Sequence, residues 1–439
     1  MRPGSIAVML GMALGLWTLL HLYTGLRLIR DSGLRGRAAR AAWSFFAASW
    51  LFPPVFLLFA RGTSPAEGAG WIAAWIAYSF VGLMGMLFPY VLARDVLWLA
   101  GTVVRLVPRD PVRARAAYNA SSALVAILAA GGAIAAAVIG ALPPRVVRVD
   151  LPVRDLPAQL EGFTIAFYSD LHLGAIGRRS LSEDIAAQVD ALHPDVAVLG
   201  GDLGDGRAAD LAAAAAPLGR ITARRFFVTG NHDYFRDLAG WLAEVKRLGY
   251  ETLTNEHRVV RRGTARVLIG GIPDYNVSTW FGTPSDPAAA RKGAPRCDVA
   301  ILLSHNPVSA PEAAGCGWDF QLSGHTHGGQ FFPWTVLFGK LPWYWPGFHR
   351  AGRMLVYVSP GAGSWGPPFR LGARTEINVF RLVRARPGRS APVHAVGRED
   401  FGQASARGAP GLVAQVAGVR EHGARRRTQP SRELGRTTG

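Results

Sequence analysis

The polar residues best suited to chemistry in this 439-residue chain stand directly after short apolar runs. Five runs end in Asp170-Leu171-His172, Gly201-Asp202, Asn231-His232-Asp233, His305-Asn306 and His325-Thr326-His327. Alternate residues of an extended segment point the same way, so Asp170 with His172, and His325 with His327, can each converge on one metal ion. These clusters offer imidazole, carboxylate and amide oxygen but no thiolate, which disfavours soft metals and leaves manganese, iron or zinc. Of these divalent ions we expect manganese.

An α/β domain must position these residues, because the apolar runs alternate with alanine-rich segments from about residue 149 to 383. The expected strands are FTIAFYS, DVAVLG, RFFVTG, VLIGGI, DVAILLS, WDFQLSG and MLVYVS. Helices are expected over 181–192, 208–218 and 238–248. Buried strands joined by helices predict a layered architecture of helices and sheets. In such sheets ligands bind beyond the carboxyl ends of the strands, so the five clusters should share one rim.

The first 148 residues predict a membrane region. Hydrophobic residues form 49% of the whole chain and charged residues only 18%, which excludes a disordered or fibrous protein. Four apolar stretches, at about 5–25, 41–60, 70–92 and 120–142, each reach the roughly 20 residues that a spanning helix needs. The segment 95–107 is shorter and carries Arg105, so we expect an interfacial amphipathic helix there.

Arginine placement predicts the orientation of these spans. The linkers after the first and third spans are rich in arginine, whereas the opposite side has only Arg2, Arg61, Arg145 and Arg148. The positive-inside rule places the rich linkers in the cytoplasm and the α/β domain outside it, as in a multi-pass protein of a bacterial inner membrane. Much of the net charge of +18 lies in these linkers and in a basic, disordered tail at 384–439. The charge therefore does not require a nucleic-acid partner.

The order of the polar clusters resembles the signature of the calcineurin-like metallophosphoesterases, which is D-x-H, G-D, G-N-H-[DE], a lone His and G-H-x-H. All five blocks occur in that order between Asp170 and His327. The segments GHTHGGQ and VSPGAGSWGPPFRLGARTEI are similar to a membrane-associated bacterial branch related to UDP-2,3-diacylglucosamine hydrolases. The resemblance implies a four-layer α/β/β/α sandwich over 149–383, preceded by the four-helix membrane region.

The resemblance also implies a role for each site residue. Seven residues would hold two divalent ions: Asp170, His172 and His327 the first, Asn231, His305 and His325 the second, and Asp202 both. Two such ions can clamp a phosphoryl group and generate hydroxide from water. His232 would donate a proton to the leaving oxygen or stabilise the transition state, and Asp233 would orient it. Arg370 could bind a substrate phosphate, or could be an ordinary surface residue.

These observations predict a membrane-anchored hydrolase of a phosphate monoester, phosphodiester or pyrophosphate. The expected substrate is linked to a lipid or to the cell envelope, because the spans keep the site near the bilayer headgroups. The competing hypotheses are a non-enzymatic metal or ligand sensor and a nuclease or nucleotide phosphodiesterase. Two features stay open: the aromatic segment 331–352 is either a core hairpin or an apolar lip at the bilayer, and Cys297 and Cys316 either pair or remain separate.

Overall fold

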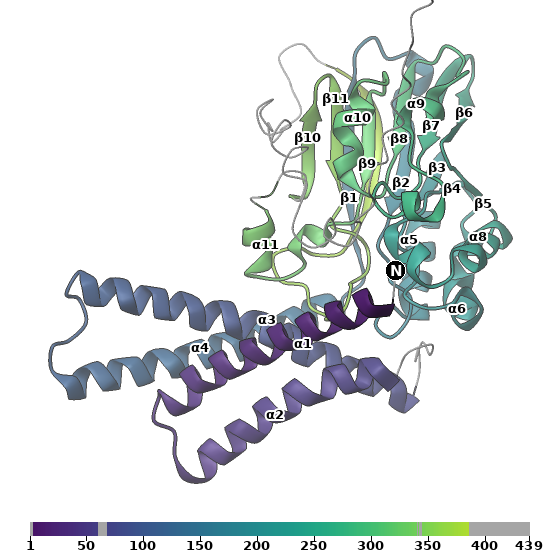
Figure 1. Cartoon of the computed structure of the whole chain (residues 1–439). Helices are drawn as coiled ribbons and strands as arrows, with labels where there is room; N and C mark the ends of the chain where they lie inside the picture. The colour runs from purple at the N-terminus through teal and green to yellow at the C-terminus, as the bar shows by residue number, and fades with distance from the viewer. Residues whose placement is uncertain (1–2, 60–67, 340, 342–344, 386–439) are drawn as a thin grey trace, which may run out of the picture.

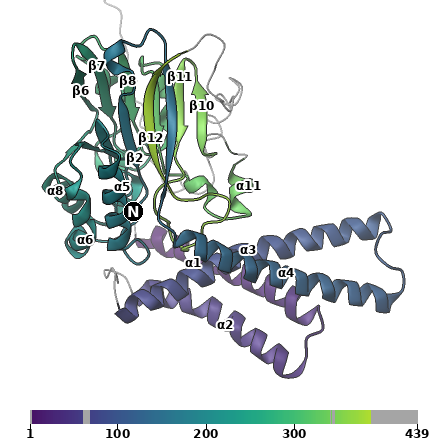
Figure 2. The ribbon, with the colours of Figure 1, turned by 180° about the vertical axis from the view of Figure 1, so that it is seen from behind.

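The computed structural model describes residues 3–59, 68–339, 341 and 345–385 (Figures 1 and 2). Its N-terminal part consists of long helices, and residues 145–385 form an α/β domain that we call the head. In both views the long helices extend sideways from beneath the head. Nearly all of the predicted basic tail lies outside the described residues.

The long helices are α1 (Pro3–Gly25), a π-helical turn (Leu26–Arg30), α2 (Gly36–Phe59), α3 (Gly68–Val103) and α4 (Pro111–Gly140). Among the described residues, three helical segments are long and apolar enough to cross a membrane: Val8–Arg30, Ala69–Val103 and Pro111–Gly140. The prediction of four spans is therefore corrected to three candidates. Helix α2 does form, with Pro53 and Pro54 inside it, but it is not among these candidates.

The segment at 95–107 is not a separate interfacial helix. Its residues up to Val103 continue α3. Asp95 Oδ2 accepts hydrogen bonds from Tyr23 Oη at 2.6 Å and from Arg27 Nε at 2.5 Å. Because partners on the first helical segment satisfy this oxygen inside the bundle, the helix can run on past Asp95.

The head contains two six-stranded sheets. In spatial order the first holds β1 (Arg145–Val153), β12 (Glu376–Arg384), β2 (Thr164–Tyr168), β3 (Val196–Leu199), β4 (Arg224–Phe227) and β5 (Tyr250–Thr252). The second holds β10 (Gly347–Ala351), β11 (Met354–Val358), β9 (Phe320–Ser323), β8 (Val299–Leu303), β7 (Ala265–Gly271) and β6 (Glu256–Arg262). Strands β2, β3 and β4 are parallel neighbours, as are β7, β8 and β9. All seven strands expected from the sequence are present.

The helices of the head are α5 (Arg179–Ala191), α6 (Ala208–Ala215), α7 (Asn231–Arg236), α8 (Leu238–Arg247), α9 (Pro287–Arg291), α10 (Ala310–Ala314) and α11 (Trp334–Phe338). The three helices predicted from the sequence correspond to α5, to α6 with the 3-10 turn that follows it, and to α8. Cys297 and Cys316 are both free thiols, so the possible disulfide is absent from the described residues.

Three hydrophobic clusters form the core of the head. One contains residues of both sheets, such as Ile165 of β2 and Ile301 of β8. A second packs the other face of the first sheet against α5, α6 and α8, with Trp241 completely buried. A third packs the second sheet against α9 and α10. This mixed α/β architecture agrees with the fold class predicted from the sequence.

The head packs directly on α3 and α4. Phe369 of the head is buried in a hydrophobic cluster formed largely by the long helices. Trp334 Nε1 donates a hydrogen bond to the carbonyl oxygen of Gly85 at 3.0 Å. The backbone N–H of Arg370 donates to the carbonyl oxygen of Ala136 at 2.9 Å. Apolar packing and hydrogen bonds thus join the α/β domain to two candidate membrane spans.

Candidate metal centre

Every predicted site residue except Arg370 lies just beyond the carboxyl end of a strand. Asp170 and His172 follow β2, Asp202 follows β3, Asn231, His232 and Asp233 open α7 after β4, His305 follows β8, and His325 and His327 follow β9. The strand-end rule therefore predicted their position correctly. Five of the seven proposed ligands have left-handed backbone, with φ between 48° and 71°: Asp170, His172, Asp202, His325 and His327. This conformation costs a non-glycine residue about 1–3 kcal/mol and is concentrated at functional sites.

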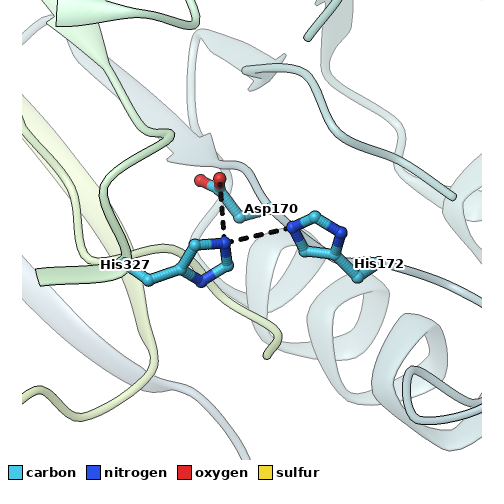
Figure 3. Close-up of side chains that lie close together, drawn as sticks. All are labelled: Asp170, His172 and His327. Atoms are coloured by element: carbon cyan, nitrogen blue, oxygen red, sulfur yellow. Dashed lines mark hydrogen bonds and ion pairs between the residues drawn. The ribbon is translucent and has the colours of Figure 1, made fainter. Parts of the chain in front are cut away.

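Asp170, His172 and His327 form the first cluster (Figure 3). Their potential ligand atoms all lie within 4.8 Å of one another, and all three residues are buried. His172 Nε2 is 3.1 Å from His327 Nε2, which is 3.5 Å from Asp170 Oδ1. Two imidazole nitrogens and one carboxylate oxygen therefore face a common point.

Asp202, His305 and His325 form the second cluster, again with ligand atoms within 4.8 Å of one another. Asp202 Oδ2 lies 3.2 Å from His305 Nε2 and 3.7 Å from His172 Nε2 of the first cluster. Its other oxygen accepts a hydrogen bond from the backbone N–H of His232 at 2.8 Å. One oxygen of Asp202 thus faces both clusters, which is the position that a bridging ligand requires.

Two buried polar atoms of the site have no hydrogen-bond partner among the described residues, namely Asn231 Oδ1 and His305 Nε2. His305 Nδ1 lies 2.8 Å from the carbonyl oxygen of Gly200, so Nδ1 donates a hydrogen bond and Nε2 is the nitrogen left to face a metal ion. His172 Nδ1 likewise faces an acceptor, Asp205 Oδ1, at 3.0 Å. Metal-binding histidines usually donate their second N–H to a carbonyl or carboxylate in this way. The unsatisfied atoms and the donor set together fit two divalent cations.

Burial and neighbouring charges displace the pKa values of the site in opposite directions. Burial disfavours charged His172, but nearby carboxylates, Asp205 foremost, outweigh it and raise the pKa of His172 to about 9. Burial lowers the pKa of His325 to about 3. Burial, together with the charge of Asp202, raises the pKa of Asp233 to about 7. Such a concentration of displaced pKa values is typical of a functional centre.

The structure assigns the orientation of His232 to a residue that the sequence did not single out. Asp205 Oδ1 lies 2.7 Å from His232 Nδ1 and 3.0 Å from His172 Nδ1. Asp233, the predicted partner, instead accepts hydrogen bonds from three backbone N–H groups, those of Gly230, Asp202 and Leu203. Asp205 follows Asp202 by three residues in the same loop. Its closeness to a predicted metal ligand is the feature of the sequence that could have identified it as a site residue.

Arg370 does not face a substrate position. Its side chain is completely buried, and Nη1 donates hydrogen bonds to the carbonyl oxygens of His327 at 3.1 Å and Pro360 at 2.9 Å. Its Nη2 lies 3.0 Å from His327 Nδ1. The predicted contact with a phosphate is therefore corrected to a structural role. Arg370 holds the loop that carries His327, while its backbone N–H bonds to α4.

Comparison with known proteins identifies the family. Residues 163–329 match the family model described as calcineurin-like phosphoesterase. A metallophosphoesterase of Aquifex aeolicus is 30% identical over 243 residues, which cover 54% of this chain and 91% of that protein. The chain belongs to the calcineurin-like metallophosphoesterases. This family of phosphoric ester hydrolases is the one predicted from the sequence blocks.

Two vertebrate relatives are named transmembrane protein with metallophosphoesterase domain. The protein of Danio rerio is 37% identical over 273 residues, covering 60% of this chain and 62% of that protein. The protein of Bos taurus is 37% identical over 259 residues, covering 56% of this chain and 58% of that protein. The chain thus spans about three fifths of the length of these two relatives. Since the relatives include vertebrate and bacterial proteins, the bacterial branch stays a prediction.

Proposed function

We propose that this protein is a membrane-anchored phosphoesterase that uses two divalent cations. The carrying observation is that Asp202 Oδ2 faces both ligand clusters. One ion would be held by Asp170, His172 and His327, the second by Asn231, His305 and His325, and both by Asp202. When bound, the ions would polarise a phosphoryl group and lower the pKa of water. Manganese is the proposed metal, because imidazoles are combined with oxygen ligands.

In this proposal His232 holds the proton for the leaving oxygen. Its Nδ1 faces Asp205 Oδ1 at 2.7 Å, so the carboxylate fixes the orientation of the ring. The opposite nitrogen, Nε2, is then the atom that can donate. The His232 side chain is 18% exposed, whereas that of His172 is 1% exposed, so His232 is the histidine of this pair that can reach a substrate.

Exposed aromatic rings near His232 support an apolar group on the substrate. The rings of Phe235 and Trp365 lie 5.5 Å and 5.7 Å from the His232 ring, and the Phe281 ring lies 5.1 Å from that of Tyr234. Phe235, Trp365 and Phe281 are 52%, 54% and 51% exposed. Clustered exposed apolar side chains mark binding surfaces. We therefore propose a phosphate ester or pyrophosphate that is linked to a lipid or to the cell envelope.

The segment from Phe331 onward supports the same substrate class. Val336, Leu337 and Phe338 of α11 are 40–50% exposed, although the neighbouring Trp334 packs on α3. An apolar lip beside candidate membrane spans favours contact with the bilayer interface over a core hairpin.

The proposed position of the head is outside the cytoplasm of a bacterial inner membrane. Arginines gather around the connection between α3 and α4, from the last turns of α3 to the first turns of α4 (residues 94–115), and the head follows α4 directly. The side of the head thus depends on α4 alone and not on whether α2 crosses the membrane. A reporter fused to the C-terminus should be active only outside the cytoplasm, and activity confined to the cytoplasm would contradict this topology.

We further propose the four-layer α/β/β/α order for the head and domain boundaries at 1–148, 149–383 and 384–439. The three core clusters support this order, because each of two separate clusters joins one sheet to its own helices while the third lies between the sheets. Cleavage by a protease of low specificity tests the boundaries; because β1 begins at Arg145 and β12 ends at Arg384, stable fragments should end just before the first residue and just after the second.

Hydrolysis by the purified full-length protein tests the activity. With manganese it should cleave aryl phosphate monoesters or diesters, and Asp202→Ala and His325→Ala should remove the activity. Asp210→Asn is a matched control, because this exposed carboxylate pairs with Arg207 outside the site. Bound metal without hydrolysis of any phosphate ester would instead favour a sensor, and cleavage restricted to nucleic acid would favour a nuclease.

A further inference from the structure

A groove between α3 and α4 lies outside the metal centre. Its volume is about 780 Å³, within the roughly 300–1,000 Å³ usual for small-molecule sites. Apolar side chains of both helices line it, among them Leu97, Leu124 and Leu128, together with Phe332 of the head. The proposed metal ligands do not line this groove, so it cannot be part of the hydrolytic site.

Arg94 is the charged residue that lines this apolar groove, and it is 93% buried. Its Nη1 donates a hydrogen bond to Ser122 Oγ at 2.5 Å, and its guanidinium carbon lies 4.4 Å from the centre of the Tyr118 ring. Its Nε is 2.7 Å from Asp95 Oδ1, but the geometry does not make a hydrogen bond. Neither Nε nor Nη2 donates a hydrogen bond to any described residue. Because a guanidinium has five N–H donors, this one keeps donors for a further acceptor.

Arg94 shares its carboxylate partner with a second arginine, because Arg27 and Arg94 both pair with Asp95. Arg27 also pairs with Asp31, whose other partner, Arg30, is 68% exposed. A buried guanidinium that shares one carboxylate and leaves N–H donors without acceptors is stabilised by a further acceptor.

We propose that this groove binds an anionic phospholipid, with the phosphate at Arg94 and an acyl chain along the walls of α3 and α4. The phosphate would supply acceptor oxygens for the N–H donors of Arg94 that no described residue accepts, since arginine binds phosphate well. The acyl chain matches the apolar walls. Both helices are candidate membrane spans, so lipid is the molecule that surrounds the groove. A zwitterionic lipid offers the same chains but no net charge, and should bind less well.

Native mass spectrometry of the full-length protein tests this proposal, with phosphatidylglycerol and phosphatidylcholine of identical acyl chains as probes. The wild-type protein should retain phosphatidylglycerol about tenfold more than phosphatidylcholine, because both lipids offer the same phosphate oxygens but the choline cation of phosphatidylcholine repels the guanidinium. Arg94→Gln should remove this preference. Arg113→Gln, an exposed arginine at the start of α4 that does not line the groove, should keep it.

A second variant keeps the proposal testable if Arg94→Gln does not fold. Ala93 is exposed and lines the groove, so Ala93→Trp should narrow the groove while leaving the guanidinium in place. This variant should retain several-fold less of either lipid. Equal retention of both lipids by the wild-type protein, or wild-type lipid binding by Ala93→Trp, would show that lipids bind only around the helices and would overturn the proposal.

Discussion

Substitution of Asp205 by asparagine should separate two tasks of one carboxylate. Asp205 Oδ1 lies 3.0 Å from His172 Nδ1 and 2.7 Å from His232 Nδ1. Asparagine keeps the shape but removes the charge, and its NH2 group would oppose a ring N–H. Losing such a partner behind a metal-binding histidine costs about 10–100-fold in metal affinity or activity, and a general acid contributes about 10²–10⁴-fold to a rate. We therefore expect metal affinity to fall about tenfold and kcat at saturating metal at least about 100-fold.

The assay should vary both manganese and the leaving group. Nitrophenolate leaves without a proton, whereas an alkoxide needs one, so the kcat of Asp205→Asn should fall more for an alkyl phosphate ester than for a nitrophenyl ester. The control is Asp210→Asn, which should keep the wild-type kcat for both esters. Equal losses for both leaving groups would refute the argument that Asp205 acts through His232. Full recovery of the rate at high manganese would show that Asp205 acts only by orienting the proposed metal ligand His172.

Three further predictions concern the metal ions and the contact between head and helices. Removal of metal by a chelator should lower the Tm, and adding the metal back should restore it. The reason is that a ligand present at 100 times its Kd stabilises the folded state by about 2.7 kcal/mol. An unchanged Tm would argue against metal binding. Gly140→Ala should lower both the Tm and the hydrolysis rate, because a Cβ there would collide with the carbonyl oxygen of Pro368. The control is Gly131→Ala, whose Cβ meets no atom within 4 Å, and it should lower neither quantity. Arg370→Lys should lower the free energy of unfolding, measured by chemical denaturation, by about 2 kcal/mol or more. The reason is that lysine cannot reproduce the hydrogen bonds of the buried guanidinium to several carbonyl oxygens. Wild-type stability of that variant would contradict the structural role of Arg370.

The strands that carry the site could be predicted because they are buried on both faces. Strands such as β3 and β8 are continuous apolar runs, and their ends are therefore easy to locate. Five strands were missed, namely β1, β5, β6, β10 and β12, and each mixes charged residues with its apolar residues. Four of them, β1, β5, β6 and β10, are edge strands of their sheets, where polar side chains are tolerated.

Side-chain partners were harder to predict than the positions of the site residues. Asp233 is next to His232 in the sequence, yet it turns toward backbone N–H groups, while Asp205 reaches the His232 ring from another loop. Arginine is rarely buried, so Arg370 was expected at a surface and not inside the loop of His327. Tertiary packing decides such contacts, and local sequence patterns do not record it.

The place of β12 in the first sheet sets the order in which the protein can be assembled. This strand comes last among the described strands, yet it lies between β1 and β2 and is the neighbour with which β1 pairs. During synthesis the long helices therefore emerge first, and β1 has no strand to join until residues 376–384 have left the ribosome. A nascent chain that cannot complete its first sheet early stays unfolded for longer, which is what the proposed position of the head outside the cytoplasm requires. A premature stop before β12 would leave two strand edges open to aggregation or proteolysis.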